Sequence, residues 1–169
     1  MKTFDLRSTK LRSGEEYRDE VTLELSPLEY AGQRYVPVPE EVPAELVVAR
    51  ASTGTVFRLR FDARLHGPCY RCLGDAVLDL GIDAREYQAT SPGESDELRT
   101  PYLDESKLDL HAWARDAIAL GLPAQILCRP DCAGLCPVCG KDLNLEPHTH
   151  EEATVDPRWE ALAKLRDEL

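Results

Sequence analysis

The sequence predicts an α+β fold, in which an antiparallel β-sheet is covered by one or two helices and followed by a cysteine-rich, zinc-binding C-terminal segment. Three observations support this prediction. Apolar and polar residues alternate over several stretches of the first half of the chain, as in half-buried strands. Further along, apolar residues recur with helical spacing. Six cysteines lie in turn-rich surroundings, which favour metal ligation over a place in an apolar core.

Strands are expected in four stretches that carry alternating or short runs of apolar residues. These residues are Val21, Leu23 and Leu25; Leu46, Val47 and Val48; Phe57, Leu59, Phe61, Ala63 and Leu65; and Leu78, Leu80, Ile82 and Ala84. A proline-rich connector with Pro37, Pro39 and Pro43 is expected between the first two stretches. Residues 52–54 indicate a hairpin, and a cysteine-containing turn joins the last two stretches as an antiparallel pair.

Two helices are expected after the sheet. The first places five apolar residues on one face, namely Leu110, Trp113, Ala114, Ala117 and Ile118. Ser106 or Asp109 would cap it, Gly121 would help to end it, and the helix can cover the dry face of the sheet. A second, short amphipathic helix is expected to begin with Asp156 as its N-cap. The acidic, turn-rich stretch 90–107 is expected to form a mobile loop.

Eight residues that can ligate a metal lie in two groups far apart in the sequence. They are Cys69 and Cys72, in the turn between two strands, and Cys128, Cys132, Cys136, Cys139, His148 and His150. A Cys-x-x-Cys turn brings two sulfurs toward one tetrahedral centre, and Gly140 lets backbone N–H groups approach the thiolates. Since a closed zinc site needs four ligands, the sequence predicts one or two Zn²⁺ ions.

Two assignments of these ligands remain open. The compact assignment puts one metal between Cys128, Cys132, Cys136 and Cys139. The split assignment, which we favour, joins Cys69 and Cys72 to Cys128 and Cys132, and joins Cys136 and Cys139 to His148 and His150. It keeps each short-range pair on one metal and ties the sheet turn to the end of the helical segment. Alternatively, the two histidines belong to a solvated loop.

Composition and missing motifs narrow the function. No apolar stretch reaches the roughly 20 residues of a membrane helix, and no signal-peptide core is visible, so we expect a cytoplasmic protein without membrane contact. The net charge of -11 opposes general attraction to a phosphate backbone and favours a basic protein partner. Motifs of nucleotide-binding loops, zinc proteases and serine hydrolases are missing, and a zinc with four protein ligands has no open position for water. We therefore expect no enzyme activity.

Three segments together resemble the YceD family. They are CYRCL at 69–73, LPAQILCRPDCAGLCPVCGKDLN at 122–144, and DPRWEALAKL at 156–165. The resemblance implies a role in accumulation of large-subunit (23S) ribosomal RNA, with a large-subunit ribosomal protein or a pre-ribosomal particle as partner. Many family members carry Cys-x-Cys where this chain has His148-Thr-His150. Because both residue types ligate zinc, the difference preserves the number of ligands.

Two functions follow as expectations. The first is a non-enzymatic zinc-binding factor in large-subunit assembly that binds ribosomal protein or pre-rRNA. The alternative is a zinc-thiolate redox or stress-responsive switch that releases metal on oxidation. The acidic residues between 94 and 105 would face a basic partner. Arg58, Arg60 and Arg64 share one face of a strand and form a candidate rRNA contact, although Asp62 interrupts the row.

The expected organisation has two parts that belong to one domain. Residues 1–127 would contain the sheet, the acidic loop and the covering helix. Residues 128–169 would contain the zinc-binding segment and the short C-terminal helix.

Overall fold

The computed structural model describes residues 3–91, 93 and 98–150. It divides the chain into two compact units, Met1–Cys132 and Ala133–Leu169. The domain division predicted at residues 127 and 128 stays a prediction. In the described part of the chain, no helix is long and apolar enough to cross a membrane.

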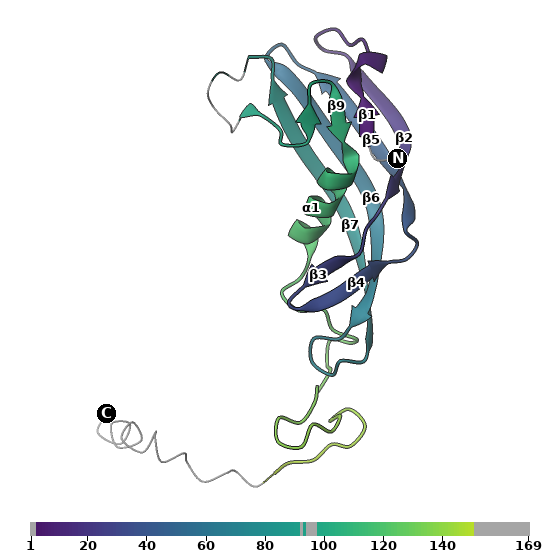
Figure 1. Ribbon diagram of the computed structural model, residues 1–169, viewed down its shortest axis with the longest axis vertical. Helices are drawn as coiled ribbons and strands as arrows, with labels where there is room; N and C mark the ends of the chain where they lie inside the picture. Colours follow the sequence, from purple (N-terminus) through teal and green to yellow (C-terminus); the bar gives the residue numbers. More distant parts are fainter. Residues whose placement is uncertain (1–2, 92, 94–97, 151–169) are drawn as a thin grey trace, which may run out of the picture. The chain divides into compact units, whose positions relative to one another are not determined.

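The first unit is built on a large antiparallel sheet (Figure 1). Its strands are β2 (Glu16–Glu24), β3 (Leu28–Tyr30), β4 (Gln33–Pro37), β5 (Glu41–Arg50), β6 (Gly54–Pro68) and β7 (Asp75–Ala89). The long strand β6 lies at the centre. It pairs with β7 along its whole length, and on its other side it pairs first with β5 and then with β4. The predicted α+β class with an antiparallel sheet is confirmed.

The alternating sequence pattern determines the two faces of β6 and β7. Phe57, Leu59 and Leu65 on β6 have no exposed surface, whereas the charged residues between them reach solvent or neighbouring side chains. The register from Gly54↔Ala89 to Pro68↔Asp75 makes the two strands a continuous antiparallel hairpin. Its tight turn contains Cys69 and Cys72, so the strand pairing fixes the position of both thiols.

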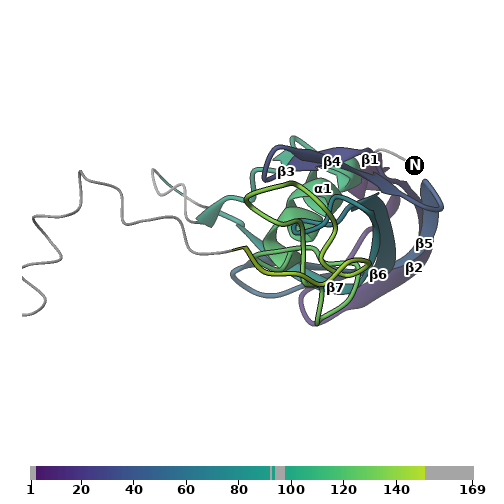
Figure 2. The same ribbon diagram turned by 90° about the horizontal axis from the view of Figure 1, so that it is seen from below.

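The single α-helix among the described residues, α1 (Leu110–Gly121), covers the apolar face of this sheet. The sheet curves around the helix when it is viewed from below (Figure 2). Asp109, rather than Ser106, is the N-cap, because its Oδ1 accepts a hydrogen bond of 2.9 Å from the backbone N–H of Ala112. All five residues predicted for the apolar helix face are buried. The second predicted helix, from Asp156, lies outside the described residues.

The proline-rich connector was predicted wrongly, because two of its three prolines lie in strands. Pro37 ends β4, and Pro43 lies within β5, opposite Thr22 of β2. Pairing between β5 and β6 begins only at Ala44. Pro43 has no N–H to donate, and it is tolerated because β6 is not paired with it at this point.

The prediction of a loop over 90–107 was wrong for the last part of this stretch, which contains strands. Residues 92 and 94–97 lie outside the part of the chain that the structure describes. A small second sheet with the order β1-β9-β8 forms from β1 (Thr3–Asp5), β8 (Leu103–Asp104) and β9 (Lys107–Asp109). Phe4 pairs with Leu108, and both side chains are buried. The burial of this apolar pair offsets the local preference of the acidic, turn-rich sequence for a loop. A short 3₁₀ helix (Leu6–Ser8) follows β1.

Candidate metal centres

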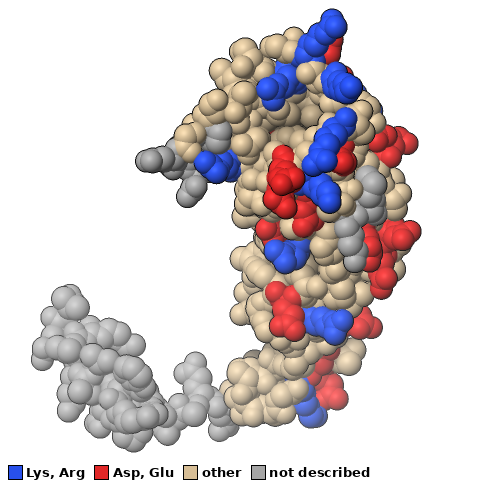
Figure 3. All heavy atoms as spheres, turned by 45° about the horizontal axis from the view of Figure 1, so that its top comes forward, with Lys and Arg blue, Asp and Glu red and all other residues tan. Residues whose placement is uncertain are grey.

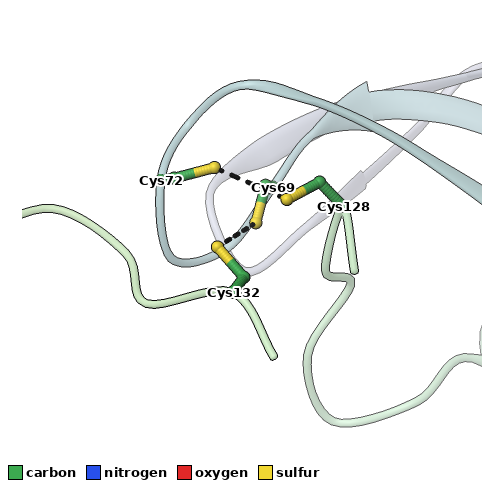
Figure 4. Close-up of side chains that lie close together, drawn as sticks. All are labelled: Cys69, Cys72, Cys128 and Cys132. Atoms are coloured by element: carbon green, nitrogen blue, oxygen red, sulfur yellow. Dashed lines mark hydrogen bonds between the residues drawn. The ribbon is translucent and has the colours of Figure 1, made fainter. Parts of the chain in front are cut away.

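Four cysteines from two distant segments converge beside the turn of the β6-β7 hairpin (Figure 4). They are Cys69 and Cys72, from the turn, and Cys128 and Cys132, from the loop after α1, and their sulfurs all lie within 4.8 Å of one another. The Sγ atoms of Cys69 and Cys132 are 3.8 Å apart, and those of Cys72 and Cys128 are 3.7 Å apart.

These sulfur distances fit the chemistry of zinc. Four sulfurs placed tetrahedrally about 2.3 Å from a central Zn²⁺ lie about 3.8 Å from one another. A disulfide requires sulfurs about 2.05 Å apart, and all six cysteines are free thiols. The four side chains therefore have the donor type, the number and the spacing of a closed tetrahedral zinc site.

Hydrogen bonds from the backbone and from one arginine side chain bring the two segments of this first cluster together. Within the turn, the N–H of Cys69 donates to the carbonyl of Gly74 at 2.7 Å, and Leu73 adopts a left-handed conformation with φ of 60°. The N–H of Tyr70 donates to the carbonyl of Ile126 at 2.8 Å. Arg71 Nη1 donates to the carbonyl of Cys132 at 3.0 Å. These bonds fasten the turn to the loop and shape the cluster.

The surroundings of Cys69 favour a thiolate. Burial opposes ionisation of this thiol, but hydrogen bonds from the backbone of Cys72, Cys128 and Arg71 outweigh burial and lower the pKa of Cys69 to about 6. Since metals bind the thiolate form of cysteine, these backbone donors prepare the sulfur for ligation.

The second unit contains a cluster of its own. It consists of Cys136, Cys139, His148 and His150, whose ligand atoms all lie within 4.8 Å of one another. The Sγ of Cys139 is 3.2 Å from Nε2 of His148. Nδ1 of His148 lies 2.7 Å from the carbonyl oxygen of Glu146, which can only accept a hydrogen bond, so Nδ1 is the protonated nitrogen. Nε2 is thereby left to bind a metal, the usual arrangement for a zinc-ligating histidine.

A tight turn presents the two sulfurs of this second cluster. The N–H of Gly140 donates to the carbonyl of Cys136 at 2.8 Å, and the φ of 72° at Gly140 suits a residue without a side chain. The pKa of Cys136 is lowered to about 6, mainly by a hydrogen bond from the backbone of Cys139. Burial opposes this shift, and a hydrogen bond from the backbone of Val138 adds to it. Two thiols and two imidazoles form a donor set typical of structural zinc.

The structure thus groups all eight predicted residues as in the split assignment. Cys128 and Cys132 lie with the two cysteines of the hairpin turn, and Cys136 and Cys139 lie with the two histidines. Metal binding by either group stays a prediction. Sequence reasoning missed Arg71 as a support of the first cluster, and it missed Asn144, whose Oδ1 accepts from the N–H of Ala133 at 2.8 Å. Neither residue carries a spacing signal that could have identified it.

The row of arginines predicted to contact rRNA is paired with carboxylates. Each of the three forms an ion pair across the sheet: Arg58 with Asp83 at 2.6 Å, Arg60 with Glu45 at 3.0 Å, and Arg64 with Asp79 at 2.6 Å. Basic and acidic side chains are interspersed along much of the face shown in Figure 3. The positive charge of the row is therefore balanced locally, which weakens its attraction for phosphates.

The fold and the two clusters define a class: an antiparallel-sheet protein that carries two groups of four cysteine and histidine side chains, each of which could hold a metal ion. A family model described as "Large ribosomal RNA subunit accumulation protein YceD" matches residues 57–166, which include all eight ligand candidates. The chain belongs to the YceD family.

Several curated relatives are similar in sequence. An uncharacterized protein of Mycobacterium tuberculosis (strain ATCC 25618 / H37Rv) is 35% identical over 127 residues, which cover 72% of this chain and 60% of the relative. An uncharacterized protein of Mycobacterium leprae (strain TN) is 36% identical over 60% of this chain and 46% of its own length. The uncharacterized protein YlbN of Bacillus subtilis (strain 168) is 28% identical over 64% of this chain and 66% of its own length. No solved structure gives a significant match.

Proposed function

We propose that this protein is a non-enzymatic, zinc-stabilised binding factor that acts in the cytoplasm in the assembly of the large ribosomal subunit and supports accumulation of 23S rRNA. The observation that carries the proposal is the convergence of two complete four-ligand sets inside the segment that the YceD family model matches. The family description supplies the link to large-subunit rRNA.

The ligand sets support a structural role for the metal. Cys69, Cys72, Cys128 and Cys132 would complete one Zn²⁺, and Cys136, Cys139, His148 and His150 would complete a second. A zinc with four protein ligands holds chain segments together and leaves no position for a reactive water. In the first cluster the metal would fasten the β6-β7 turn to the segment after α1.

Charge favours a protein over RNA as the first partner. The chain carries a net charge of -11, and Arg58, Arg60 and Arg64 are already bound to carboxylates. An acidic surface attracts basic proteins and repels phosphates. The partner we propose is a basic ribosomal protein of the large subunit, alone or within a pre-ribosomal particle.

The experiment is deletion of the gene, followed by complementation with the wild type or with Cys69→Ser. We expect deletion to lower the ratio of large to small subunits in sucrose gradients and the level of mature 23S rRNA. The wild-type gene should restore both, and the tagged full-length chain should sediment with large-subunit precursors. A normal subunit ratio after deletion, with no such cosedimentation, would refute the proposal.

The alternative function is a redox switch, and the close Sγ pairs of Cys69 with Cys132 and of Cys72 with Cys128 favour it. Oxidation of zinc thiolates releases the metal. If the protein is a switch, mild peroxide should release zinc from the purified chain, and the deletion phenotype should appear only under oxidant. If the deletion strain has a subunit defect without oxidant, and the purified chain keeps its zinc at mild peroxide doses, the protein is an assembly factor and not a switch.

A further inference from the structure

A gap in strand pairing opens a groove beside β6. Along β6, pairing with β5 ends at Phe61, and pairing with the next strand, β4, begins at Leu65. At this gap lies a cavity of about 500 Å³. Its walls are mostly apolar and include Val38, Pro39, Val42, Pro43, Ala63 and Leu80. We call this cavity the β6-β7 groove.

Gly81 of β7 keeps the groove open. It pairs with Asp62 of β6, and a second hollow of about 380 Å³ shares Pro43, Asp62 and Gly81 with the groove. A Cβ atom built on Gly81 would meet only Asp62 Oδ1, at 3.5 Å, and the backbone there needs no positive φ. Neither local crowding nor backbone conformation therefore requires a glycine here. A glycine inside a strand often marks the close approach of a ligand or of another backbone.

The charges on the groove leave one carboxylate without a partner. Arg64 and Asp79 neutralise each other, with Nε of Arg64 2.6 Å from Oδ1 of Asp79. Among the described residues, Asp62 forms no hydrogen bond or ion pair, and it lies where the two hollows meet. A carboxylate beside apolar groove walls is complementary to a lysine or arginine side chain, whose stem is apolar and whose end is charged.

We propose that the β6-β7 groove binds an extended segment of a basic protein, in which a lysine or arginine stands next to small apolar residues. The basic side chain pairs with Asp62, and its apolar neighbours cover Val38 and Leu80. The partner's backbone passes over Gly81. This proposal rests on the proposed function and adds the surface through which the partner is held. The unpaired carboxylate of Asp62 disfavours RNA as the occupant.

The test is site-specific photo-crosslinking of the full-length chain in growing cells, with p-benzoylphenylalanine as the probe. In one strain the probe replaces Val38, which lines the groove, and in the control strain it replaces Val77, which does not line it. The two side chains are equally accessible, with exposed fractions of 47% and 48%. We expect the probe at position 38 to crosslink a large-subunit ribosomal protein, at a segment that carries a lysine or arginine beside apolar residues.

Three second-site variants show whether the groove itself makes the contact. Gly81→Leu fills the groove and should abolish the crosslink from position 38. Asp62→Asn removes the charge and should reduce the crosslink yield about three- to fivefold, the scale of an exposed ion pair. Glu20→Gln removes an equal charge from β2, away from the groove, and should leave the yield unchanged. Thermal unfolding of each variant checks that it is folded. If Gly81→Leu is unstable, the crosslink yield of Asp62→Asn alone tests whether the groove makes the contact.

Three other outcomes would refute the proposed binding in the groove. If position 77 crosslinks the large-subunit protein and position 38 does not, the partner binds elsewhere and only the groove proposal fails. A crosslink from position 38 to RNA or to a second copy of this chain also refutes it, as does a yield unchanged by both groove variants. Loss of the groove contact leaves the proposed function standing, whereas a normal subunit ratio after deletion, together with no cosedimentation with large-subunit precursors, refutes the proposed function.

Discussion

Replacing Cys69 by serine should release one zinc and loosen the hairpin turn. Cys69 is fully buried, and its sulfur lies beside that of Cys132, which is 63 positions away in the sequence. A metal bridge that closes a loop of this length restricts the unfolded chain as a disulfide does, and the loop-closure relation gives about 4 kcal/mol. For a chain of 169 residues, this corresponds to a fall in melting temperature of roughly 10 °C.

Elemental analysis and calorimetry of protein purified without chelator measure this effect. The wild type should contain two zinc ions per chain, and Cys69→Ser should contain one and unfold at the lower temperature. Cys139→Ser is the matched control, because it removes one ligand from the cluster of the second unit. That variant should also lose one zinc but leave the main unfolding transition in place. If Cys69→Ser keeps two zinc ions, or if metal-free wild type melts like the loaded protein, the reasoning is wrong.

Three further predictions concern the first unit. Trp113→Ala should lower the free energy of unfolding by about 3–5 kcal/mol in urea titrations, because a buried side chain leaves a cavity under the sheet. Asp109→Ala removes the N-cap of α1 and should cost about 1 kcal/mol in the same assay. The pKa of Asp83, lowered to about 2 by the hydrogen bond from Arg58, should rise toward about 3.9 in Arg58→Gln when its carboxyl carbon is followed by NMR. Because the folded-state value is the lower one, this pair stabilises the fold above about pH 4, and the contribution is lost as the pH falls to about 2.

The sequence predicted those parts of the fold in which a local pattern coincides with burial. The alternation from Phe57 to Leu65 became the central strand, and the helical spacing around Trp113 became α1. The sequence did not predict strand pairs whose members lie far apart along the chain. Nothing near Phe4 shows that it will pair with Leu108, more than a hundred residues away. The place of Pro43 within a strand was not predicted. A proline fits there because β6 is not paired with it, and the local sequence does not show where that pairing begins.

The candidate metal centres were more predictable than the sheet topology. The Cys-x-x-Cys spacing identifies pairs such as Cys69 with Cys72, because two such residues in a turn necessarily lie close together. The joining of two pairs depends on tertiary structure. The hydrogen bond between Tyr70 and Ile126 fastens the hairpin turn to the loop after α1, and Cys128 and Cys132 of this loop lie beside Cys69. Spacing alone could not distinguish the split assignment from the compact one.

The order of the ligands along the chain has a consequence for synthesis. The last ligand of the first cluster, Cys132, and the first ligand of the second, Cys136, are separated only by residues 133–135. A growing chain therefore exposes the whole first set before any member of the second, and His150 is the last of the eight to leave the ribosome. If metal is taken up during translation, the hairpin turn is secured first, and the second site is filled later, once His150 has emerged.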